Sequence, residues 1–345
     1  MRRPYESNKD GGPKPDRRPD GTHEENDFTP EDNDFTPDRR PDGNNMAITT
    51  PIDQAANPTE PTATAATWAV IRDFARRRTL GAIGAAVVVV MIVVGVFAGL
   101  LAPYDPLAVD FGAMLTKPNA AHWLGTDAFG RDVLSRLIYG SRTALLVGFG
   151  AAVFGATIGA VLGVGSAYFG GRVDLYLQRL MDIFLSFPLI ILALALVAIL
   201  GNSIPNVIMA ITIPMIPRAA LVIRSSALTI REMPYVDAAR AAGFGHVRII
   251  LRHMLPNVIA PYLIMLTAFL SQAILAESSL SFLGLGVQEP TAAWGLMLRG
   301  AAVDFAEAAP WMALFPGFAI SLAVFAFNLF GDSLRDALDP KLRTL

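Results

Sequence analysis

The sequence contains no cysteine and few charged residues. Only 17% of its 345 residues are charged, against about 25% in ordinary soluble domains, while 53% are hydrophobic. The lack of cysteine excludes disulfides, thiolate catalysis and cysteine-ligated metals. The net charge of -2 provides no broad basic surface, so nucleic acid is not expected as a partner. This composition indicates a protein that crosses a membrane several times.

Motifs for catalysis and cofactor binding are also lacking. A Walker A loop needs a Gly-Lys pair before Ser or Thr to hold phosphates. The lysines are Lys9, Lys14, Lys117 and Lys341, and none follows a glycine. The four histidines, His23, His122, His246 and His253, lack the spacing of a metal site. We therefore expect no catalytic residue, no metal and no cofactor in this chain, which would not be an enzyme by itself.

Residues 1–67 differ from the rest of the chain because they are polar and rich in Pro, Asp, Asn, Gly and Thr. "PDRRPDG" occurs at 15–21 and again at 37–43. Without large apolar residues such a segment cannot offset the entropy lost on ordering. We predict a disordered cytoplasmic tail, either a plain linker, which is favoured, or a docking motif. Met46 could be the true start, and no signal peptide is expected because the first apolar run starts near Leu80.

The predicted membrane domain, residues 68–345, contains six apolar runs long enough to cross a bilayer, which needs about 20 residues. They lie at about 80–102, 144–167, 180–200, 206–228, 257–279 and 310–330. "RDFARRR" before the first run places the N-terminus in the cytoplasm by the positive-inside rule. Six crossings return the C-terminus to the cytoplasm. The loop 103–143, expected outside, supports the rule least because it is also basic.

A charged passage, residues 229–256, interrupts the apolar runs on the predicted cytoplasmic side. Read as a helix, 235–242 places four residues on one continuous face: Tyr235, Ala238, Ala239 and Ala242. Gly243 and Gly245 then favour a turn. A second apolar set follows with the same spacing: Val247, Ile250, Leu251 and Met254. The pattern predicts two short amphipathic helices, and it fits either a docking element or a helix that lies on lipid headgroups.

The same passage resembles the "EAA" loop of ABC-importer permeases, whose pattern is Glu-Ala-Ala, three residues, Gly, nine residues, Ile, one residue, Leu-Pro. This chain has Asp237-Ala238-Ala239, then Gly243, and later Leu255-Pro256. Asp237 replaces the glutamate, and His253 replaces the isoleucine. In that family the loop docks on the ATP-binding subunit. The resemblance implies docking by Tyr235, Asp237, Ala238, Ala239, Ala242, Gly243, Leu255 and Pro256.

The resemblance extends from about residue 103 to 343. "HWLGTDAFGRDVLSRLIYGSRTALLVG", "ILAESSLSFLGLGVQEPTAAWG" and "FNLFGDSLRDALDPKLR" are similar to the C-type permease of dipeptide, oligopeptide and nickel importers. It implies an all-α, six-span type I permease with both termini inside, in a bacterial cell membrane. The implied partners are membrane lipid, a second, B-type permease, two ATP-binding subunits that use ATP and Mg, and an extracytoplasmic substrate-binding protein. Dipeptides or oligopeptides are the expected substrate, with nickel or another small solute as alternatives.

Three ionisable residues lie in or near the predicted spans, where charge is costly and often functional. Asp182, Arg218 and Glu277 are candidates for the translocation pathway, although a structural role is the favoured reading of the two acids. The outer segment "GTDAFGRDVLSRLIYG", residues 125–140, predicts a separate short helix that braces the gate or receives a binding protein, with the brace favoured. The rival functions are an ion-gradient-driven secondary transporter and a non-transporting scaffold.

Overall fold

The computed structural model describes residues 78–305 and 307–338, within the compact unit Pro61–Leu345. The predicted tail, residues 1–67, lies outside the described residues. The regular structure of the described part is helical, apart from an isolated β-bridge between Thr126 and Asp132. The prediction of an all-α fold is therefore confirmed for this part of the chain.

Five helical stretches in the described residues are long and apolar enough to cross a membrane. They are α2 (Thr79–Val96), α4 (Val133–Phe169), α7 (Ile204–Arg231), the continuous column His246–Phe282 that ends in α10 (Ile259–Phe282), and α12 (Trp311–Leu338). A sixth crossing is formed if α5 (Gly171–Leu185) and α6 (Leu189–Leu200) count as one broken span. Shorter elements are α3 (Ala98–Leu101), η1 (Phe111–Ala113), α8 (Pro234–Ala241) and α11 (Trp294–Asp304).

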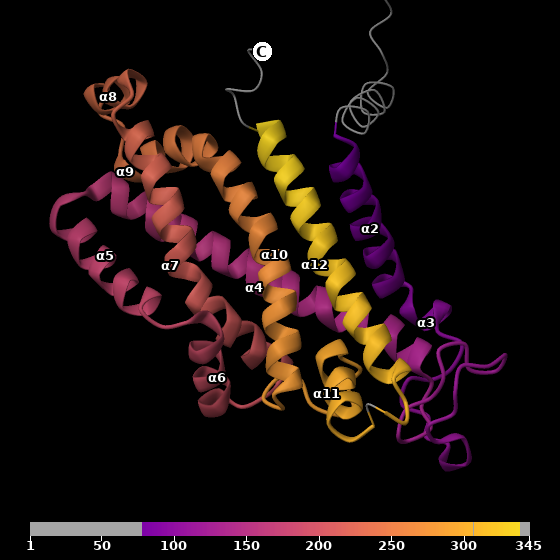
Figure 1. Cartoon of the computed structure of the whole chain (residues 1–345). Helices are drawn as coiled ribbons and strands as arrows, with labels where there is room; N and C mark the ends of the chain where they lie inside the picture. Colours follow the sequence, from indigo (N-terminus) through magenta and orange to yellow (C-terminus); the bar gives the residue numbers. More distant parts are fainter. Residues whose placement is uncertain (1–77, 306, 339–345) are drawn as a thin grey trace, which may run out of the picture. The chain divides into compact units, whose positions relative to one another are not determined.

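The two ends of the bundle carry different elements. The start of α2 and the end of α12 lie at the end that carries α8, whereas α3, the loop after it and α11 lie at the opposite end (Figure 1). Arg78 and Asp336 join the first and last of these helices through an ion pair of 2.9 Å. This placement agrees with an even number of crossings. We call the two ends the α8 end and the α11 end.

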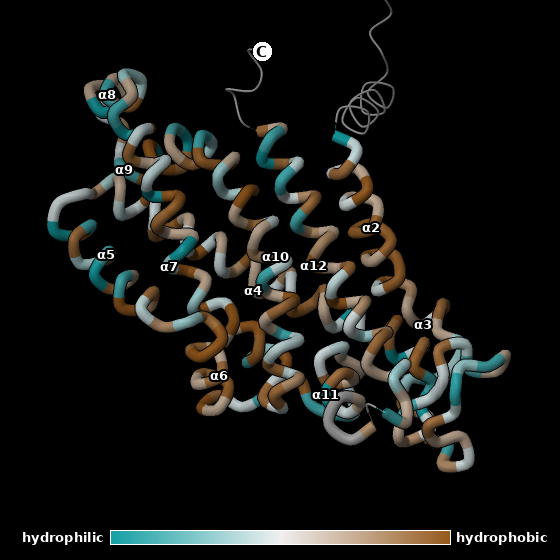
Figure 2. Tube along the Cα trace, in the orientation of Figure 1, coloured by the Kyte–Doolittle hydropathy of each residue, from teal (hydrophilic) through white to brown (hydrophobic). Residues whose placement is uncertain are grey.

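Hydrophobic residues dominate the crossing helices, and hydrophilic residues gather at the ends of the bundle, as a membrane protein requires (Figure 2). In Figure 2 the hydrophobic colour dominates α2 and α6, while hydrophilic residues gather at α8 and in the loop that precedes α4. α5 differs from these spans because it carries charged residues at positions 172, 174, 179 and 182. It is amphipathic, so its polar side needs water, headgroups or a partner protein.

The third span is a correction to the predicted continuous run 180–200. α5 ends at Leu185 and α6 begins at Leu189, and the two helices meet at an angle of 89°. Pro188 lacks the N–H that would bond to Phe184, and its ring disfavours the helical conformation at residue 187. Asp174 on α5 accepts a hydrogen bond of 2.6 Å from Nε of Arg224 on α7. This bond ties α5 to α7 on its side of the break.

The second span is much longer than predicted, because α4 begins at Val133 rather than near residue 144. Asp132 caps its first turn by accepting a hydrogen bond from the Ser135 backbone N–H at 2.8 Å. The predicted separate outer helix, residues 125–140, is therefore wrong: residues 125–132 are not helical, and residues 133–140 are the first part of α4. With 37 residues α4 is about 55 Å long, more than the roughly 30 Å hydrocarbon core.

Small residues let α4 and α7 approach closely. A Cβ added to Gly159 would lie 2.4 Å from Cβ of Ala219, and one added to Gly163 would lie 2.6 Å from the carbonyl oxygen of Ala220. Neither position has room for a larger side chain. Most of the buried residues of α4 are Gly, Ala or Ser, which suits this close approach.

Replacing Gly159 with leucine is expected to destabilise the bundle by about 3 kcal/mol or more, because the added side chain overlaps α7. A matched change on the same helix, Gly165→Leu, adds its Cβ where no atom lies within 4 Å. Thermal unfolding of the detergent-purified variants should show a lower Tm for Gly159→Leu and a nearly unchanged Tm for Gly165→Leu. Equal transitions would contradict the close packing of α4 on α7.

Candidate functional site

At the α8 end the chain turns back sharply after α8, over residues 242–244. Gly243 has φ of +76°, and its N–H donates to the carbonyl of Arg240 at 2.9 Å. The N–H of Phe244 donates to the carbonyl of Ala239 at 3.1 Å, which completes a Schellman turn after α8. No atom lies within 4 Å of a Cβ added at Gly243. Glycine is therefore required here by the backbone conformation and not by lack of space.

The predicted docking residues of this passage are mostly on the surface. Tyr235, Asp237, Ala238, Ala242, Gly243 and Pro256 are exposed, and Leu255 is half-buried. Ala239 differs from them because it is only 6% exposed and packs in a core with Val236 and Ile249. The expected continuous face of small residues is thus divided between the surface and the core. Docking itself stays a prediction for these residues.

The second half of the passage is not a separate interfacial helix. α9 (His246–Ile249) continues through the π turn η2 (Ile250–Met254) and the 3-10 turn η3 (Leu255–Val258) into α10. The N–H of Leu255 donates to the carbonyl of Ile250, the wider spacing of a π turn. Pro256 has no N–H for an ordinary α-helical bond, which explains the change of helix type.

The π turn also changes which residues face inward. The spacing predicted an apolar face formed by Val247, Ile250, Leu251 and Met254. In the structure Met254 is fully buried, whereas Val247 and Leu251 are 70% and 58% exposed. The widened turn shifts the helical register, so equal spacing does not keep residues on one face. The α8 end therefore presents two large apolar side chains beside α8.

His253, which stands where the motif expects isoleucine, lies in a group of aromatic rings. Its ring stacks on Phe244 with centroids 6.0 Å apart, and it lies 6.4 Å from the ring of Tyr235. The guanidinium of Arg248 lies 4.2 Å from the centroid of Phe244 on the same stack. A flat imidazole therefore holds α8 against the helix that follows the turn.

A second set of contacts connects the turn to the last residues of α4. The hydroxyl of Tyr168 lies 2.8 Å from Nδ1 of His246, and the guanidinium of Arg240 lies 5.5 Å from the Tyr168 ring. Arg240 also donates to Asp237, the acid of the motif, at 2.9 Å. These contacts join α8 and the turn to the end of α4.

The three predicted pathway residues occupy different environments. Asp182 is exposed on α5, with Arg179 at 3.7 Å. Arg218 is exposed halfway along α7, and no ion pair is formed by it within the described ranges. Glu277 is 1% exposed and accepts hydrogen bonds from Ser281 at 2.7 Å and Ser278 at 3.3 Å. Its burial favours a structural role for Glu277, and the translocation pathway stays a prediction for all three residues.

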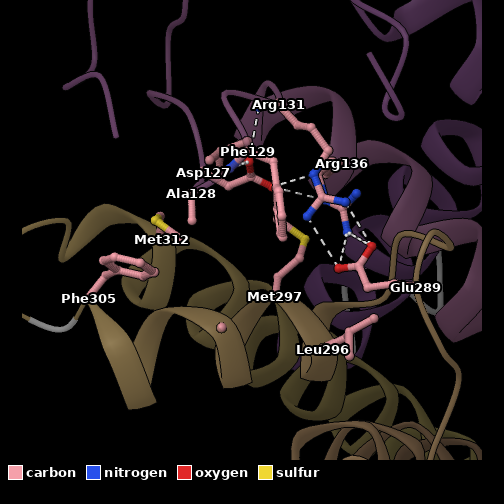
Figure 3. Close-up of a pocket in the computed structure, with 12 residues that line it drawn as sticks. Asp127, Ala128, Phe129, Arg131, Arg136, Glu289, Leu296, Met297, Phe305 and Met312 are labelled. Atoms are coloured by element: carbon pink, nitrogen blue, oxygen red, sulfur yellow. Dashed lines mark hydrogen bonds and ion pairs between the residues drawn. The ribbon is translucent and has the colours of Figure 1, made fainter. Parts of the chain in front are cut away.

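The α11 end holds a charged cluster formed by Asp127, Arg131, Arg136 and Glu289 (Figure 3). Nε of Arg131 donates to Asp127 at 2.7 Å, and its Nη1 donates to Glu289 at 2.8 Å. Nη2 of Arg136 donates to both Glu289 oxygens at 3.2 and 3.4 Å. The cluster joins the segment before α4 to the loop between α10 and α11, which favours the predicted brace.

Burial differs sharply within the charged cluster. The side chains of Arg136, Arg131 and Asp127 are 1%, 10% and 11% exposed, whereas that of Glu289 is 46% exposed. Burial opposes the charge of Arg131, but its hydrogen bond to Glu289 and the nearby carboxylates outweigh this and raise the pKa of Arg131. Arg131 therefore stays charged at neutral pH.

A cavity of about 320 Å³ lies against the charged cluster. Apolar side chains from α4, α11 and α12 form much of its wall, among them Val133, Leu296, Met297 and Met312. Figure 3 shows Arg136 and Glu289 facing each other at one edge, with Met297 beside them. The sequence offered no signal for Glu289, because the residue lies 158 positions from Arg131.

Comparison with known proteins places these features in a family. Residues 133–344 match the family described as binding-protein-dependent transport system inner membrane component, and residues 67–118 match the N-terminal TM domain of oligopeptide transport permease C. The chain is 41% identical over 270 residues to the dipeptide transport system permease protein DppC of Alkalihalophilus pseudofirmus, covering 78% of this chain and 88% of that protein.

Another permease and a solved structure are also similar to this chain. The glutathione transport system permease protein GsiD of Shigella flexneri serotype 5b is 44% identical over 269 residues, covering 78% of this chain and 88% of GsiD. Among solved structures, an inward-facing MetNI methionine ABC transporter aligns with a TM-score of 0.48 and 20% identity, over 60% of this chain and 97% of that chain. The chain belongs to the binding-protein-dependent transport system inner membrane components and is a multi-pass permease subunit of an ABC transporter.

Proposed function

We propose that this permease imports dipeptides or oligopeptides by alternating access, driven by ATP hydrolysis in separate subunits. The relatives are named for dipeptide, glutathione and peptide transport, which supports a peptide-like substrate. In this assignment the α8 end is cytoplasmic and the α11 end faces outward, following the basic residues before α2. Nickel or another small solute is the alternative substrate.

The observation that carries the proposal is the exposed α8, fixed by the Gly243 turn at one end of a bundle of membrane-crossing helices. Its surface residues Tyr235, Ala238 and Ala242 form a small convex element that a groove of another protein can enclose. The Tyr168–His246 contact then passes its displacement to α4. A rigid helix with a buried inner face and a free outer face suits the transmission of force.

The partners follow from the same arrangement. Two ATP-binding subunits would supply ATP and Mg and would each hold one such loop, one from this chain and one from a second, B-type permease. α5 supports the second permease, because Met181 is its buried residue and apolar side chains such as Val173, Tyr176 and Ile183 are exposed. Closure of the ATPases would move both loops and open the permease pair outward.

Arg218 is the residue we assign to the pathway. It lies 14 residues after Ile204 and 13 before Arg231, about 20 Å from either end of α7, and so near the middle of a bilayer. An exposed arginine at that depth is costly unless water, an acid or a substrate carboxylate meets it. The C-terminal carboxylate of a peptide is such a group, and guanidinium binds carboxylate in a bidentate manner.

Replacing Arg218 with leucine is expected to reduce ATP-driven peptide uptake about tenfold, the effect of losing roughly 1.4 kcal/mol of substrate binding. Arg218→Lys keeps the charge and should retain part of the uptake. Uptake of a labelled peptide into proteoliposomes measures both. Arg179→Leu removes a charge from exposed α5 as a control, and wild-type uptake by Arg218→Leu would remove this residue from the pathway.

Reconstitution tests the function as a whole. The permease pair, its ATPases and its binding protein are assembled in liposomes, and uptake of dipeptide, longer peptide and nickel is measured with and without ATP. Peptide uptake that requires both ATP and the binding protein supports the proposal. Uptake that follows an ion gradient without ATP would favour a secondary transporter, and absence of uptake would favour a scaffold.

A further inference from the structure

The cavity beside the charged cluster has the properties of a binding site. Its volume of about 320 Å³ is at the lower end of the range for pockets that hold ligands. Much of its wall is apolar, and charged groups gather at one edge. A single large apolar side chain with a polar neighbour therefore matches it better than a bulky charged ligand does.

Arg136 provides a donor that the chain leaves unused. Its side chain is 1% exposed, and Nε has no hydrogen-bond partner among the described residues. Oδ2 of Asp127 lies 3.7 Å from this Nε, which is too far for a hydrogen bond. Because an unpaired buried donor is unfavourable, the site gains from an additional acceptor close to Arg136.

Glu289 is the most exposed member of the cluster. It is 46% exposed, and its contacts with Arg136 are long, at 3.2 and 3.4 Å. Its carboxylate bridges both arginines at the edge of the cavity (Figure 3). Another carboxylate in the same place would keep the charge balance and could approach Arg136 more closely.

We propose that this cavity receives an apolar side chain of the substrate-binding protein, while a neighbouring carboxylate of that protein replaces Glu289 on Arg131 and Arg136. The inference rests on the proposed import function and adds a docking site to it. The cavity is lined at the start of α4, on α11 and at the start of α12, which lie together at the α11 end (Figure 1), and none of its lining residues belongs to α5 or α7. This separation favours a docking partner over the peptide in transit.

Filling the cavity tests the apolar half of the proposal. Gly300 lines the cavity on α11, and no atom lies within 4 Å of an added Cβ. Gly300→Phe should therefore fold and weaken association of the binding protein by about tenfold or more, as expected for a blocked anchor pocket. Ala308→Phe places the same side chain on the exposed surface of the α11 end, outside the cavity, as a matched control.

Removing the charge of Glu289 tests the carboxylate half of the proposal. A docking site and a simple brace predict different changes in the affinity of the binding protein. If Glu289 occupies the place of an incoming carboxylate, Glu289→Gln removes a competitor and should tighten association several-fold. If Glu289 is only a brace, the same change should leave association unchanged or weaken it. Thermal unfolding of each variant shows whether the α11 end remains folded.

The measurement uses the complete permease–ATPase complex in nanodiscs and the purified binding protein at fixed salt, with the dissociation constant as the readout. Weaker binding by Gly300→Phe, with tighter binding by Glu289→Gln, supports the proposal. Unchanged binding in both, with ATP-dependent uptake intact, overturns the docking site and leaves the import function standing. If Gly300→Phe lowers uptake without changing association, the cavity serves the transported peptide and the proposal is wrong. If the unmodified complex shows no ATP-dependent uptake, the import function itself is contradicted.

Discussion

Gly243→Pro should abolish ATP-driven uptake while the protein still inserts in the membrane. Gly243 has φ of +76°, whereas proline is restricted to about −65°. Proline also lacks the N–H that donates to the carbonyl of Arg240. The reversal after α8 cannot form in the variant, so α8 loses its orientation. A loss of more than about 1.4 kcal/mol in docking reduces coupled transport at least about tenfold.

A second glycine provides the matched control for this change. Gly245 lies two residues later, has φ of −65°, and already has the backbone angle of proline. The carbonyl of Gly245 accepts a hydrogen bond from the N–H of Ile249, and a proline at this position keeps that carbonyl. Gly245→Pro should therefore preserve most of the uptake. The measurements are peptide uptake and ATP hydrolysis in proteoliposomes, and wild-type uptake by Gly243→Pro would show that the turn does not couple the ATPase to transport.

Ala238→Glu and Ala239→Glu should impair the protein in different ways, the first by blocking docking and the second by lowering stability. Ala238 is exposed on α8, whereas Ala239 is 6% exposed in the core with Val236 and Ile249. Ala238→Glu should leave folding within about 0.5 kcal/mol of the wild type, as is usual for surface changes, and block docking through charge and size. Ala239→Glu buries an unpaired carboxylate and should destabilise the α8 end by several kcal/mol.

Co-purification and thermal unfolding together separate the two outcomes. Ala238→Glu is expected to melt like the wild type but to lose its ATPase subunits during purification. Ala239→Glu is expected to show a lower Tm whether or not the ATPases are present. Retention of the ATPases by Ala238→Glu would mean that this face of α8 is not the docking surface. Equal stability of both variants would contradict the burial of Ala239.

Several features of the site follow from local sequence and were predicted from it. Gly243 after a short run of alanines specifies a helix end with positive φ, because other residues avoid that conformation. The apolar runs specify membrane-crossing helices, since only helices satisfy their own backbone in lipid. The identity of the passage as an importer loop rests on ordered motifs, and the family comparison confirms the family.

Other features required contacts between distant parts of the chain. The glycine that ends α8 could be read from the sequence, but the inward position of Ala239 depends on the core formed with Ile249, Met254 and Val258. The π turn at Ile250–Met254 shifted the face that simple helical spacing predicted. The 89° bend before α6 is allowed by Pro188, and the Asp174–Arg224 bond helps to fix α5 on its side of the bend.

By itself the sequence determined an all-helical membrane protein, its approximate spans and the turn at Gly243, because composition, periodicity and glycine geometry act over a few neighbouring residues. The tertiary structure decided which side of α8 is free, where α5 turns, and that Glu289 meets Arg131 and Arg136 beside a cavity. Residues 158 and 153 positions apart become neighbours only when the helices between them pack. That packing depends on the shapes of whole helix faces, which no local pattern contains.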